Sequence, residues 1–278
     1  MDQSNKKKVN QRQANQIPDN SIPDNSGQMN QFARIEQLLG YENMGKIKTA
    51  TVAVFGLGAV GSFATEALAR TGVGNLELVD FDQVDPSNIN RQLFALHSTI
   101  GRGKAELAVE RIKDINPSCN ITVHSSFVNA RSLEDLLHDK IDVVVDAIDG
   151  LNSKINLLVT ARQMDLKVVS SMGAGGRINA SMIKSGDISE TCVCPLARVV
   201  RQRLHRRGIF DGICAVYSTE KALNKQPFNP EDSVDALKNH GRRRPPIGTV
   251  CWVPGVFGLT IAGKVIDIIL STSRVPHL

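Results

Sequence analysis

The sequence predicts an α/β protein built on a doubly wound, Rossmann-like and mostly parallel sheet, followed by a C-terminal α+β extension. Three observations support this fold class. Short apolar runs alternate with helical segments of roughly a dozen residues between positions 51 and 172. The first run ends on the pattern G-x-G-x-x-G, which opens the next helix. Residues 141–146 are almost wholly apolar, as in a central strand covered on both faces.

The elements up to residue 171 follow from these runs and from helix-stop signals. Thr71-Gly72 and Asn116-Pro117 each end a helical segment, because glycine and proline interrupt helices. We expect helices over residues 34–47, 62–70, 102–115, 131–138 and 153–165. We expect strands over residues 51–55, 76–80, 121–124, 141–146 and 168–171.

The pattern changes after Gly173-Ala-Gly-Gly176. The expected elements are an extended pair around residues 178–188, an arginine-rich helix over 195–207, a strand near 214–218, a long loop over 224–246 and a closing helix over 256–271. The loop is expected because its polar sequence contains four prolines. Small residues in the closing helix, such as Gly258, would let it pack closely against another element or a second subunit.

Residues 1–30 are expected to form a disordered polar tail, and residues 31–278 one folded domain with a core over 51–172 and an extension over 173–278. The tail is rich in Asn, Gln, Ser and Lys and repeats the sequence Ile-Pro-Asp-Asn-Ser in tandem. Such a segment buries too little apolar surface to offset the entropy cost of ordering it. It also lacks the apolar stretch of a secretory signal.

Composition indicates a soluble cytoplasmic protein without a membrane span. The most apolar stretch, residues 250–270, contains Lys264 and Asp267 and is expected to be a buried helix. Five irregularly spaced cysteines without a C-x-x-C pair suit a reducing cytoplasm. Cys192 and Cys194 form a C-x-C pair, which leaves a zinc site as a minor alternative. The net charge of +5 excludes no class of partner.

The glycine pattern predicts a phosphate-binding loop. Gly56, Gly58 and Gly61 lie between a strand and a helix, where backbone N–H groups and the helix dipole favour an anion. Asp80 follows 19 residues after Gly61, at the end of the second strand, where a carboxylate can hold ribose hydroxyls. These residues fit both a dinucleotide and ATP.

The polar run that follows favours ATP over NAD. Residues 80–92 are dense in Asp, Ser, Asn and Arg, and they lie just past a strand's carboxyl end. Arg91 and Lys104 would supply cations for a triphosphate, and Asp149, which ends the run of residues 143–149, would hold a metal ion. Asp82 and Asp85 are interpreted as solvated or structural residues.

This arrangement resembles the ubiquitin-activating-like adenylating enzymes of the ThiF/MoeB/HesA type, from about Phe32 to Ala180. The resemblance implies that residues 31–278 form a ThiF-type ATP-binding adenylating domain. It implies that Asp80 holds the ribose, that Lys104 binds phosphates and that Asp149 binds magnesium. Further nucleotide contacts are implied for Ala59, Ser87, Asn88, Asn90 and Arg91.

The same resemblance implies a homodimer in which Arg34 reaches the partner's ATP site. Two positions depart from the family pattern. Gln31 stands where an arginine is usual, and Ala59 stands where glycine is frequent. The alanine is acceptable if only its backbone N–H is used.

Within this family the chain most resembles the branch that dehydrates threonylcarbamoyladenosine in tRNA. The residues that carry this resemblance are Ser171–Gly176, Pro195–Val200, Val216–Glu220 and Val256–Gly258. The branch implies that ATP converts the threonylcarbamoyl carboxylate of tRNA into an acyl-adenylate, which then cyclises. Arginines 198, 201, 203, 206, 207 and 242–244 would contact tRNA phosphates, and the scarcity of aromatic residues argues against base stacking.

Three alternatives remain from the sequence. The first is adenylation of a ubiquitin-like or sulfur-carrier protein tail, with Cys192 or Cys194 as a reactive thiol and a sulfur-transfer protein as partner. The second is an NAD(P)-dependent dehydrogenase. The third is a non-catalytic module that binds a nucleotide or tRNA.

Overall fold

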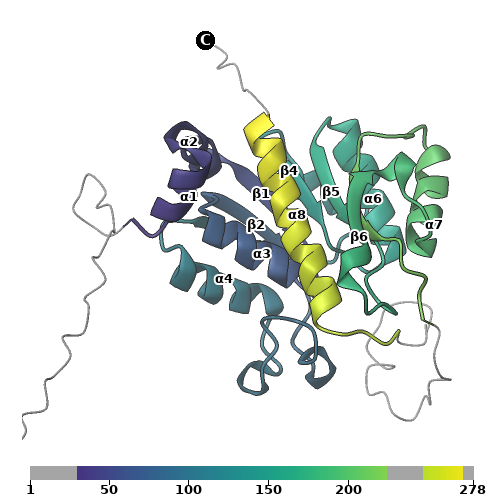
Figure 1. The fold of residues 1–278 in the computed structure, drawn as a ribbon, viewed down its shortest axis with the longest axis horizontal. Coiled ribbons are helices and arrows are strands. Elements are labelled where there is room, and N and C mark those ends of the chain that lie inside the picture. The colour runs from purple at the N-terminus through teal and green to yellow at the C-terminus, as the bar shows by residue number, and fades with distance from the viewer. Residues whose placement is uncertain (1–29, 224–246, 272–278) are drawn as a thin grey trace, which may run out of the picture.

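The computed structural model describes residues 30–223 and 247–271. Within these residues a seven-stranded sheet has the order β3-β2-β1-β4-β5-β7-β6 (Figure 1). All neighbouring strands are parallel except β6, which is antiparallel to β7. The strands are β1 (Thr51–Phe55), β2 (Asn75–Val79), β3 (Asn120–His124), β4 (Val143–Asp146), β5 (Lys167–Ser171), β6 (Ile183–Asp187) and β7 (Cys214–Ser218). The predicted mostly parallel, doubly wound sheet is confirmed.

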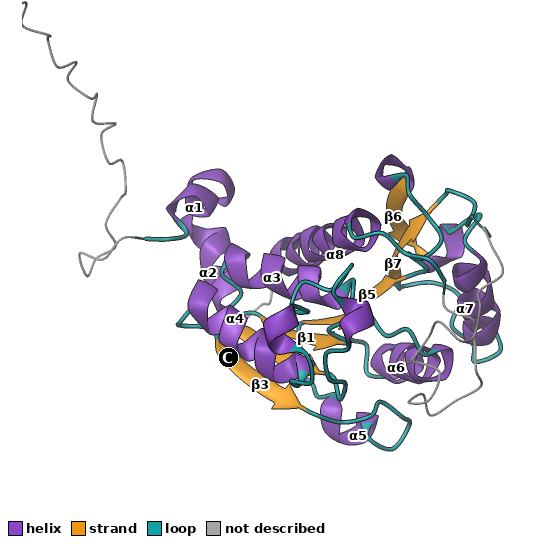
Figure 2. Cartoon of the chain, turned by 90° about the horizontal axis from the view of Figure 1, so that it is seen from below, coloured by secondary structure: helices purple, strands orange, loops and turns teal. Residues whose placement is uncertain are grey.

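Helices cover both faces of the sheet (Figure 2). One face carries α1, α2, α3, α4 and α8, and the other carries α5, α6 and α7. The helices are α1 (Ala33–Leu39), α2 (Tyr41–Thr49), α3 (Gly61–Thr71), α4 (Lys104–Ile115), α5 (Leu133–Leu136), α6 (Leu151–Gln163), α7 (Pro195–His205) and α8 (Trp252–Ser271). This three-layer arrangement explains why the central strands are apolar throughout.

Three expected elements differ in the structure. The helix expected over residues 34–47 is two helices, because Gly40 between them has φ of 87°. The helix expected over 131–138 is the single turn α5, after which the buried Leu137 is extended. Residues 178–188 contain one strand instead of a pair, because Ala180–Met182 form a 3₁₀ turn and β6 pairs with β7.

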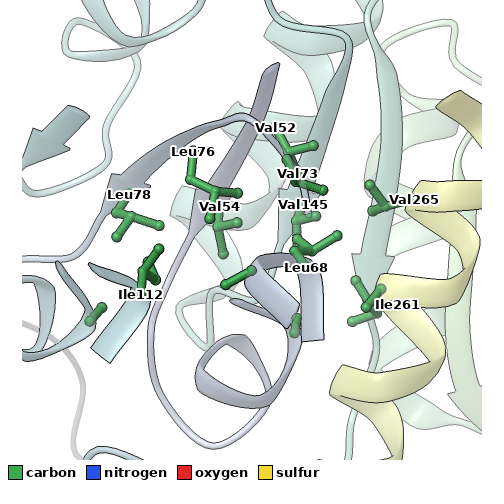
Figure 3. Packing of buried hydrophobic residues seen from close by; sticks show 14 of the residues in the cluster. Val52, Val54, Leu68, Val73, Leu76, Leu78, Ile112, Val145, Ile261 and Val265 are labelled. Atoms are coloured by element: carbon green, nitrogen blue, oxygen red, sulfur yellow. The ribbon is translucent and has the colours of Figure 1, made fainter. Parts of the chain in front are cut away.

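Two apolar layers lie between the sheet and its helices. On β1, Val52 and Val54 face the layer under α3 and α8, whereas Ala53 and Phe55 face the layer under α6. Figure 3 shows the first layer, to which α8 contributes Ile261. All five side chains are fully buried. The central strand is therefore held on both faces, which fixes the position of the loop at its end.

Helix α8 packs across the sheet and against the start of α3. Among the described helices it is the one long and apolar enough to span a membrane, yet 56% of its most apolar window is buried inside the protein. At Gly258 a Cβ atom would lie 2.5 Å from the Val60 carbonyl oxygen and 2.8 Å from the Ala64 nitrogen. The close packing predicted for this helix is therefore found at Gly258, against α3.

The predicted disordered tail (1–30), except for Asn30, and the predicted loop (224–246), including Arg242–Arg244, lie outside the described residues.

Candidate functional site

Most of the predicted site residues lie at one edge of the sheet, where the parallel strands end. The glycine loop follows β1, Asp80 follows β2, and Asp149 lies three residues past β4. Strand β1 lies between β2 and β4, so the chain turns to opposite sides after β1 and before β4. In open α/β sheets, the crevice at such a switch point is where ligands bind.

The three glycines of the loop differ in how closely other protein atoms approach them. Gly56 has φ of 91°, and a Cβ atom there would lie 2.7 Å from the Ala147 carbonyl oxygen. A Cβ atom on Gly61 would lie 1.7 Å from the Gly56 carbonyl oxygen. At Gly58, by contrast, the nearest atom would be 3.7 Å away. The first and third glycines are therefore required by the fold, whereas the second leaves space for a ligand.

The backbone N–H groups of this loop are available for an anion. Within the described part of the chain, no acceptor pairs with the amides of Gly58, Ala59 or Val60. They lie at the amino end of α3, where the helix dipole also favours negative charge. Ala59 is thus compatible with a binding role that uses only its backbone.

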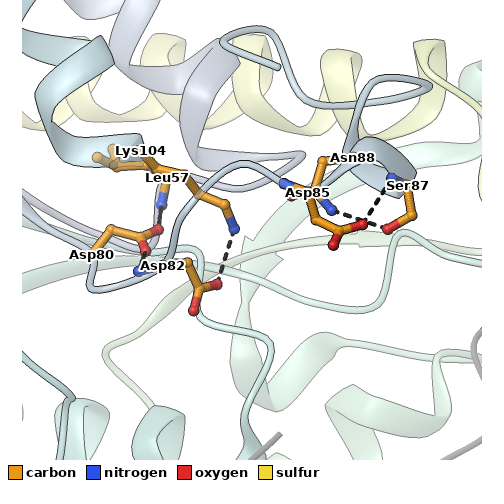
Figure 4. Close-up of polar contacts among 7 residues, drawn as sticks. All are labelled: Leu57, Asp80, Asp82, Asp85, Ser87, Asn88 and Lys104. Carbon is orange, nitrogen blue, oxygen red and sulfur yellow. Dashed lines mark hydrogen bonds and ion pairs between the residues drawn. The ribbon is translucent and has the colours of Figure 1, made fainter. Parts of the chain in front are cut away.

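Asp80 joins the end of β2 to the glycine loop. Its carboxylate accepts hydrogen bonds from the Leu57 N–H at 2.6 Å and the Asp82 N–H at 2.8 Å (Figure 4). Burial raises the pKa of Asp80, and the charge of Lys104 and these two backbone donors oppose that rise. Its oxygens retain further lone pairs, so the same carboxylate can also accept from a ligand hydroxyl.

Lys104 is a buried cation at the start of α4. Its Nζ lies 2.9 Å from Asp82 Oδ2, and the lysine side chain is 7% exposed (Figure 4). Asp82 was interpreted as solvated or structural, and the structure gives it a specific partner. The pair holds the ammonium group beside Asp80 instead of leaving it on the surface.

A compact turn follows at residues 85–91. Asp85 accepts from the Ser87 N–H at 2.9 Å, and the Asn88 side chain accepts from the Asp85 N–H at 3.2 Å. Arg91 Nη1 donates to the Ser87 carbonyl at 2.7 Å and to Asn90 Oδ1 at 2.8 Å. These bonds use a single nitrogen of the guanidinium group, which leaves other donors for a ligand.

Two contacts tie this polar segment to the rest of the site. Asn90 Nδ2 donates to the Thr249 carbonyl at 3.2 Å, just before α8. Ser62 Oγ, in the first turn of α3, accepts from the Leu93 N–H at 3.2 Å. The segment is therefore anchored against both helices that border the glycine loop.

Asp149 is an exposed carboxylate at the same edge. Among the residues that the structure describes, none forms a hydrogen bond or ion pair with it. No cluster of three or more His, Cys, Asp or Glu residues that could hold a metal occurs in the described ranges. A single free carboxylate fits Mg²⁺ that arrives with phosphates, because this ion is typically bound by one or two carboxylates plus phosphate oxygens and water.

Arg34 is not brought to this edge within one chain. It is exposed on α1, and α1 and α2 lie beside the amino end of β1, because α2 ends at Thr49 just before that strand (Figure 1). The predicted role of Arg34 would therefore require a second copy of the chain.

A fully buried ion pair beneath the site was missed by the sequence analysis. Lys154 Nζ lies 2.6 Å from Asp146 Oδ2 and also donates to the Ser171 carbonyl at 3.0 Å. Ser170 Oγ donates to the same carboxylate oxygen at 2.5 Å, and the Ile148 N–H donates to the other at 3.1 Å. Through the bond from the Ile148 N–H, the pair holds the segment directly before Asp149 in place.

Two further features also went unpredicted. Phe81 and Phe127 form an edge-to-face pair with ring centroids 5.3 Å apart, and each is about half exposed next to Asp80. Arg177 is buried and donates to the carbonyls of Gly173 at 2.5 Å and Gly175 at 3.0 Å. Phe81 and Phe127 lie far apart in the sequence, and Arg177 also donates to the distant Glu220 carbonyl at 3.2 Å, so no local pattern indicates either feature.

The two cysteines of the C-x-C pair differ in exposure. Cys192 is exposed, whereas Cys194 is buried, with its Sγ 3.7 Å from the position that a Cβ atom on Gly173 would take, just past β5. Tyr217 lies against Cys192. The pKa of the Tyr217 phenol is raised, mainly by burial and next by the neighbouring Cys192 thiol.

Comparisons with known proteins agree with this geometry. The model of the ThiF family matches residues 30–277. The tRNA threonylcarbamoyladenosine dehydratase of Bacillus subtilis is 39% identical over 239 residues, which cover 86% of this chain and 94% of that protein. The Haemophilus influenzae protein of the same name is 33% identical, over 86% of this chain and 93% of its own. The crystal structure of E. coli tRNA N6-threonylcarbamoyladenosine dehydratase in complex with ATP has a TM-score of 0.77 and 30% identity, covering 90% of this chain and 97% of that one.

Proposed function

Because the chain belongs to the ThiF family, we propose that it is an ATP-dependent enzyme that dehydrates threonylcarbamoyladenosine in tRNA through an acyl-adenylate. The observation that supports this function is the set of groups gathered where the parallel strands end. A loop with free backbone amides is bonded to Asp80 and flanked by the buried Lys104. This arrangement supports a site for a nucleoside triphosphate, and the relatives described above carry the name of dehydratases of this tRNA nucleoside.

ATP would bind with its phosphates on the amides of Gly58, Ala59 and Val60. Asp80 would accept hydrogen bonds from the ribose hydroxyls while it keeps its bond to Leu57. The half-exposed rings of Phe81 and Phe127 offer apolar surface next to Asp80 for the adenine. This orientation would direct the α-phosphate toward the crevice between β1 and β4.

Lys104 and Arg91 would neutralise the charge that develops as pyrophosphate leaves. Lys104 uses one of its three N–H donors on Asp82, and Arg91 uses one of its two terminal nitrogens, so both have donors for phosphate oxygens. Ser87, Asn88 and Asn90 would line the nucleotide from the turn that follows β2. Preorganised donors of this kind act mainly on the transition state.

Asp149 would be the residue that holds a magnesium ion, which typically also binds phosphate oxygens and water. The bound ion would supply charge neutralisation at the oxygens of the leaving group. The Lys154–Asp146 pair would keep the loop of Asp149 in place, because Asp146 binds the Ile148 N–H directly before it.

In the reaction, a carboxylate oxygen of the threonylcarbamoyl group would attack the α-phosphorus, and the bond to pyrophosphate would break. The resulting mixed anhydride would then be attacked at its carbonyl carbon by an atom of the same substituent. The ring closes as the bond to AMP breaks, so the net change in the tRNA is the loss of one water. Positioning and charge neutralisation suffice here, and no side-chain nucleophile is needed.

A cytoplasmic homodimer is part of the proposal. Arg34 lies at the far edge of its own sheet, so only the partner subunit's site is available to it as a phosphate ligand. The residue is exposed, and exposed Leu38 follows one turn later on the same helix, where it could contact a second copy.

The alternative of activating a ubiquitin-like or sulfur-carrier protein tail would need an accessible thiol. Only Cys192 of the C-x-C pair is exposed. A covalent carrier adduct that disappears in Cys192→Ser would support this alternative and a sulfur-transfer partner.

The deciding experiment is mass analysis of tRNA nucleosides after incubation with the protein, ATP and Mg²⁺. The proposal expects threonylcarbamoyladenosine to be replaced by a nucleoside one water lighter, with one pyrophosphate released per conversion. Conversion in the absence of ATP, or pyrophosphate release without any change in the nucleoside, would contradict it.

A further inference from the structure

An exposed aromatic pair lies at the carboxyl end of α7. Phe210 is 60% exposed, and its ring centroid is 5.1 Å from that of His205 with the planes inclined by 43°. A single exposed apolar side chain is common on protein surfaces and carries little information. This one is notable because of its neighbours, Arg206 and Arg207, which are also exposed.

The arginines of α7 divide into two groups. Arg201 Nη1 donates to the Thr191 carbonyl at 2.6 Å, and Arg203 Nη1 donates to Asn152 Oδ1 at 2.7 Å, so both are used within the fold. Arg198, and Arg206 and Arg207 just after the helix, are exposed, and no carboxylate of the described residues forms an ion pair with them. Arg207 makes only a long bond, from Nη1 to the Arg203 carbonyl at 3.4 Å. Their charge is therefore available to an anionic partner.

A cavity of about 210 Å³ opens beside the exposed ring. It is lined by Arg162, Gln163, Gly208, Ile209, Phe210 and Asp211. The Nε of Arg162 is buried and has no hydrogen-bond partner among the described residues. This nitrogen is covered by protein atoms, and Nη1 of the same group lies 3.6 Å from Asp165 Oδ1, so the cavity shows only that open space lies beside the ring.

We propose that His205, Arg206, Arg207 and Phe210 form a stacking surface for an unpaired loop of the tRNA, an inference that rests on the proposed function. Phe210 and His205 stack on a base turned out of the loop, whereas Arg206 and Arg207 contact the neighbouring phosphates. Flat rings beside unpaired guanidinium groups fit RNA, because a protein partner would need a larger apolar patch. This proposal departs from the expectation that the scarcity of aromatic residues argues against base stacking.

The stacking surface lies toward the opposite edge of the sheet from the nucleotide site, and α7 runs between the two. Helix α7 begins where Cys194 and Leu196 approach Gly173, at the carboxyl end of β5. It ends near the amino end of β7, eleven residues later, which corresponds to about 16 Å of helix. Arg198 lies between the two ends. A loop whose modified base enters the ATP site can therefore place nearby nucleotides along α7.

The test measures tRNA binding and tRNA-dependent pyrophosphate release in Phe210→Ala, Phe210→Tyr and Arg206→Ala/Arg207→Ala. The probe is tRNA that carries threonylcarbamoyladenosine. We expect Phe210→Ala to weaken binding by about 5- to 150-fold, which corresponds to ~1–3 kcal/mol per stacked base. Phe210→Tyr keeps the ring and should bind within about threefold of the parent. The arginine pair should lower the slope of log Kd against log salt by about 1.4–1.8.

Controls separate this inference from the proposed function. Leu259→Ala removes a similarly exposed apolar side chain from α8, and Lys48→Ala/Arg131→Ala removes two exposed cations elsewhere; neither should change tRNA binding. ATP affinity and melting temperature should be unchanged in all variants. In Phe210→Ala and in the arginine pair, KM for tRNA should rise while kcat is retained. Parent-like tRNA binding by Phe210→Ala in an enzyme that still converts its tRNA overturns the stacking surface alone. Failure of the parent to convert tRNA overturns both.

Discussion

The buried Lys154–Asp146 pair offers the sharpest test of how the site is supported. Lys154→Met removes a side chain that is 1% exposed and leaves the Asp146 carboxylate, at 0% exposure, bonded only to Ser170 and the Ile148 N–H. An uncompensated buried charge of this kind costs about 3–5 kcal/mol. Since a whole domain is stable by only about 5–15 kcal/mol, the loss is a large fraction of the total.

Urea unfolding followed by far-ultraviolet circular dichroism measures this loss. With a slope of about 3 kcal/mol per molar urea, the midpoint of Lys154→Met should fall by about 1–2 M. The double variant Lys154→Met/Asp146→Asn removes both charges and should recover at least about 2 kcal/mol, because replacing a whole buried pair is often nearly neutral. A single variant within about 1 kcal/mol of the parent, or a double variant that shows no recovery, would refute the reasoning.

Three further predictions follow from the same site and core. Gly61→Ala should fail to fold, because its Cβ would lie 1.7 Å from the Gly56 carbonyl oxygen. Gly58→Ala should fold but lose the thermal stabilisation that ATP gives the parent. A thermal shift assay distinguishes the two variants, and equal stability of both would be contrary evidence. Lys104→Ala should slow tRNA-dependent pyrophosphate release by about 30- to 1,000-fold, which corresponds to ~2–4 kcal/mol. Asp149→Ala should abolish this release with an unchanged melting temperature. Full activity in Asp149→Ala would contradict the proposal that Asp149 holds the metal ion. Burial raises the pKa of the Cys119 thiol from 9.0 to about 11, so stability from this group is fully present below pH 9 and is lost as pH rises toward 11. Urea midpoints between pH 8 and pH 11 should show this decline in the parent and a weaker one in Cys119→Ala.

The central sheet could be predicted because its strands are buried on both faces. Residues such as Val143, Val144 and Val145 must all be apolar when helices cover both sides, and this leaves a continuous run in the sequence. The glycine loop was equally visible, since its first and third glycines meet backbone atoms at distances that no side chain tolerates. Local constraints of this kind can be recognised from a few consecutive residues of the sequence.

Contacts between distant segments were not visible in the same way. The partner of β6 is β7, which lies beyond a whole helix, and no local signal specifies that pairing. Lysines are mostly exposed, so neither the burial of Lys154 nor its pairing with Asp146 could be expected. The arginines of residues 198–207 look alike in sequence, and only the structure separates Arg201 and Arg203, whose Nη1 atoms bond to other segments of the fold, from those that form no such contact.

The position of α8 has a consequence for how the nucleotide site is completed. Gly258 packs against the first turn of α3, next to the phosphate loop, although about 200 residues of sequence separate the two elements. A chain in which α8 had not yet docked would lack this support and would expose the apolar surface of β4 and β5. Nucleotide binding should therefore report on the docking of α8, even though none of the predicted nucleotide contacts lies on that helix.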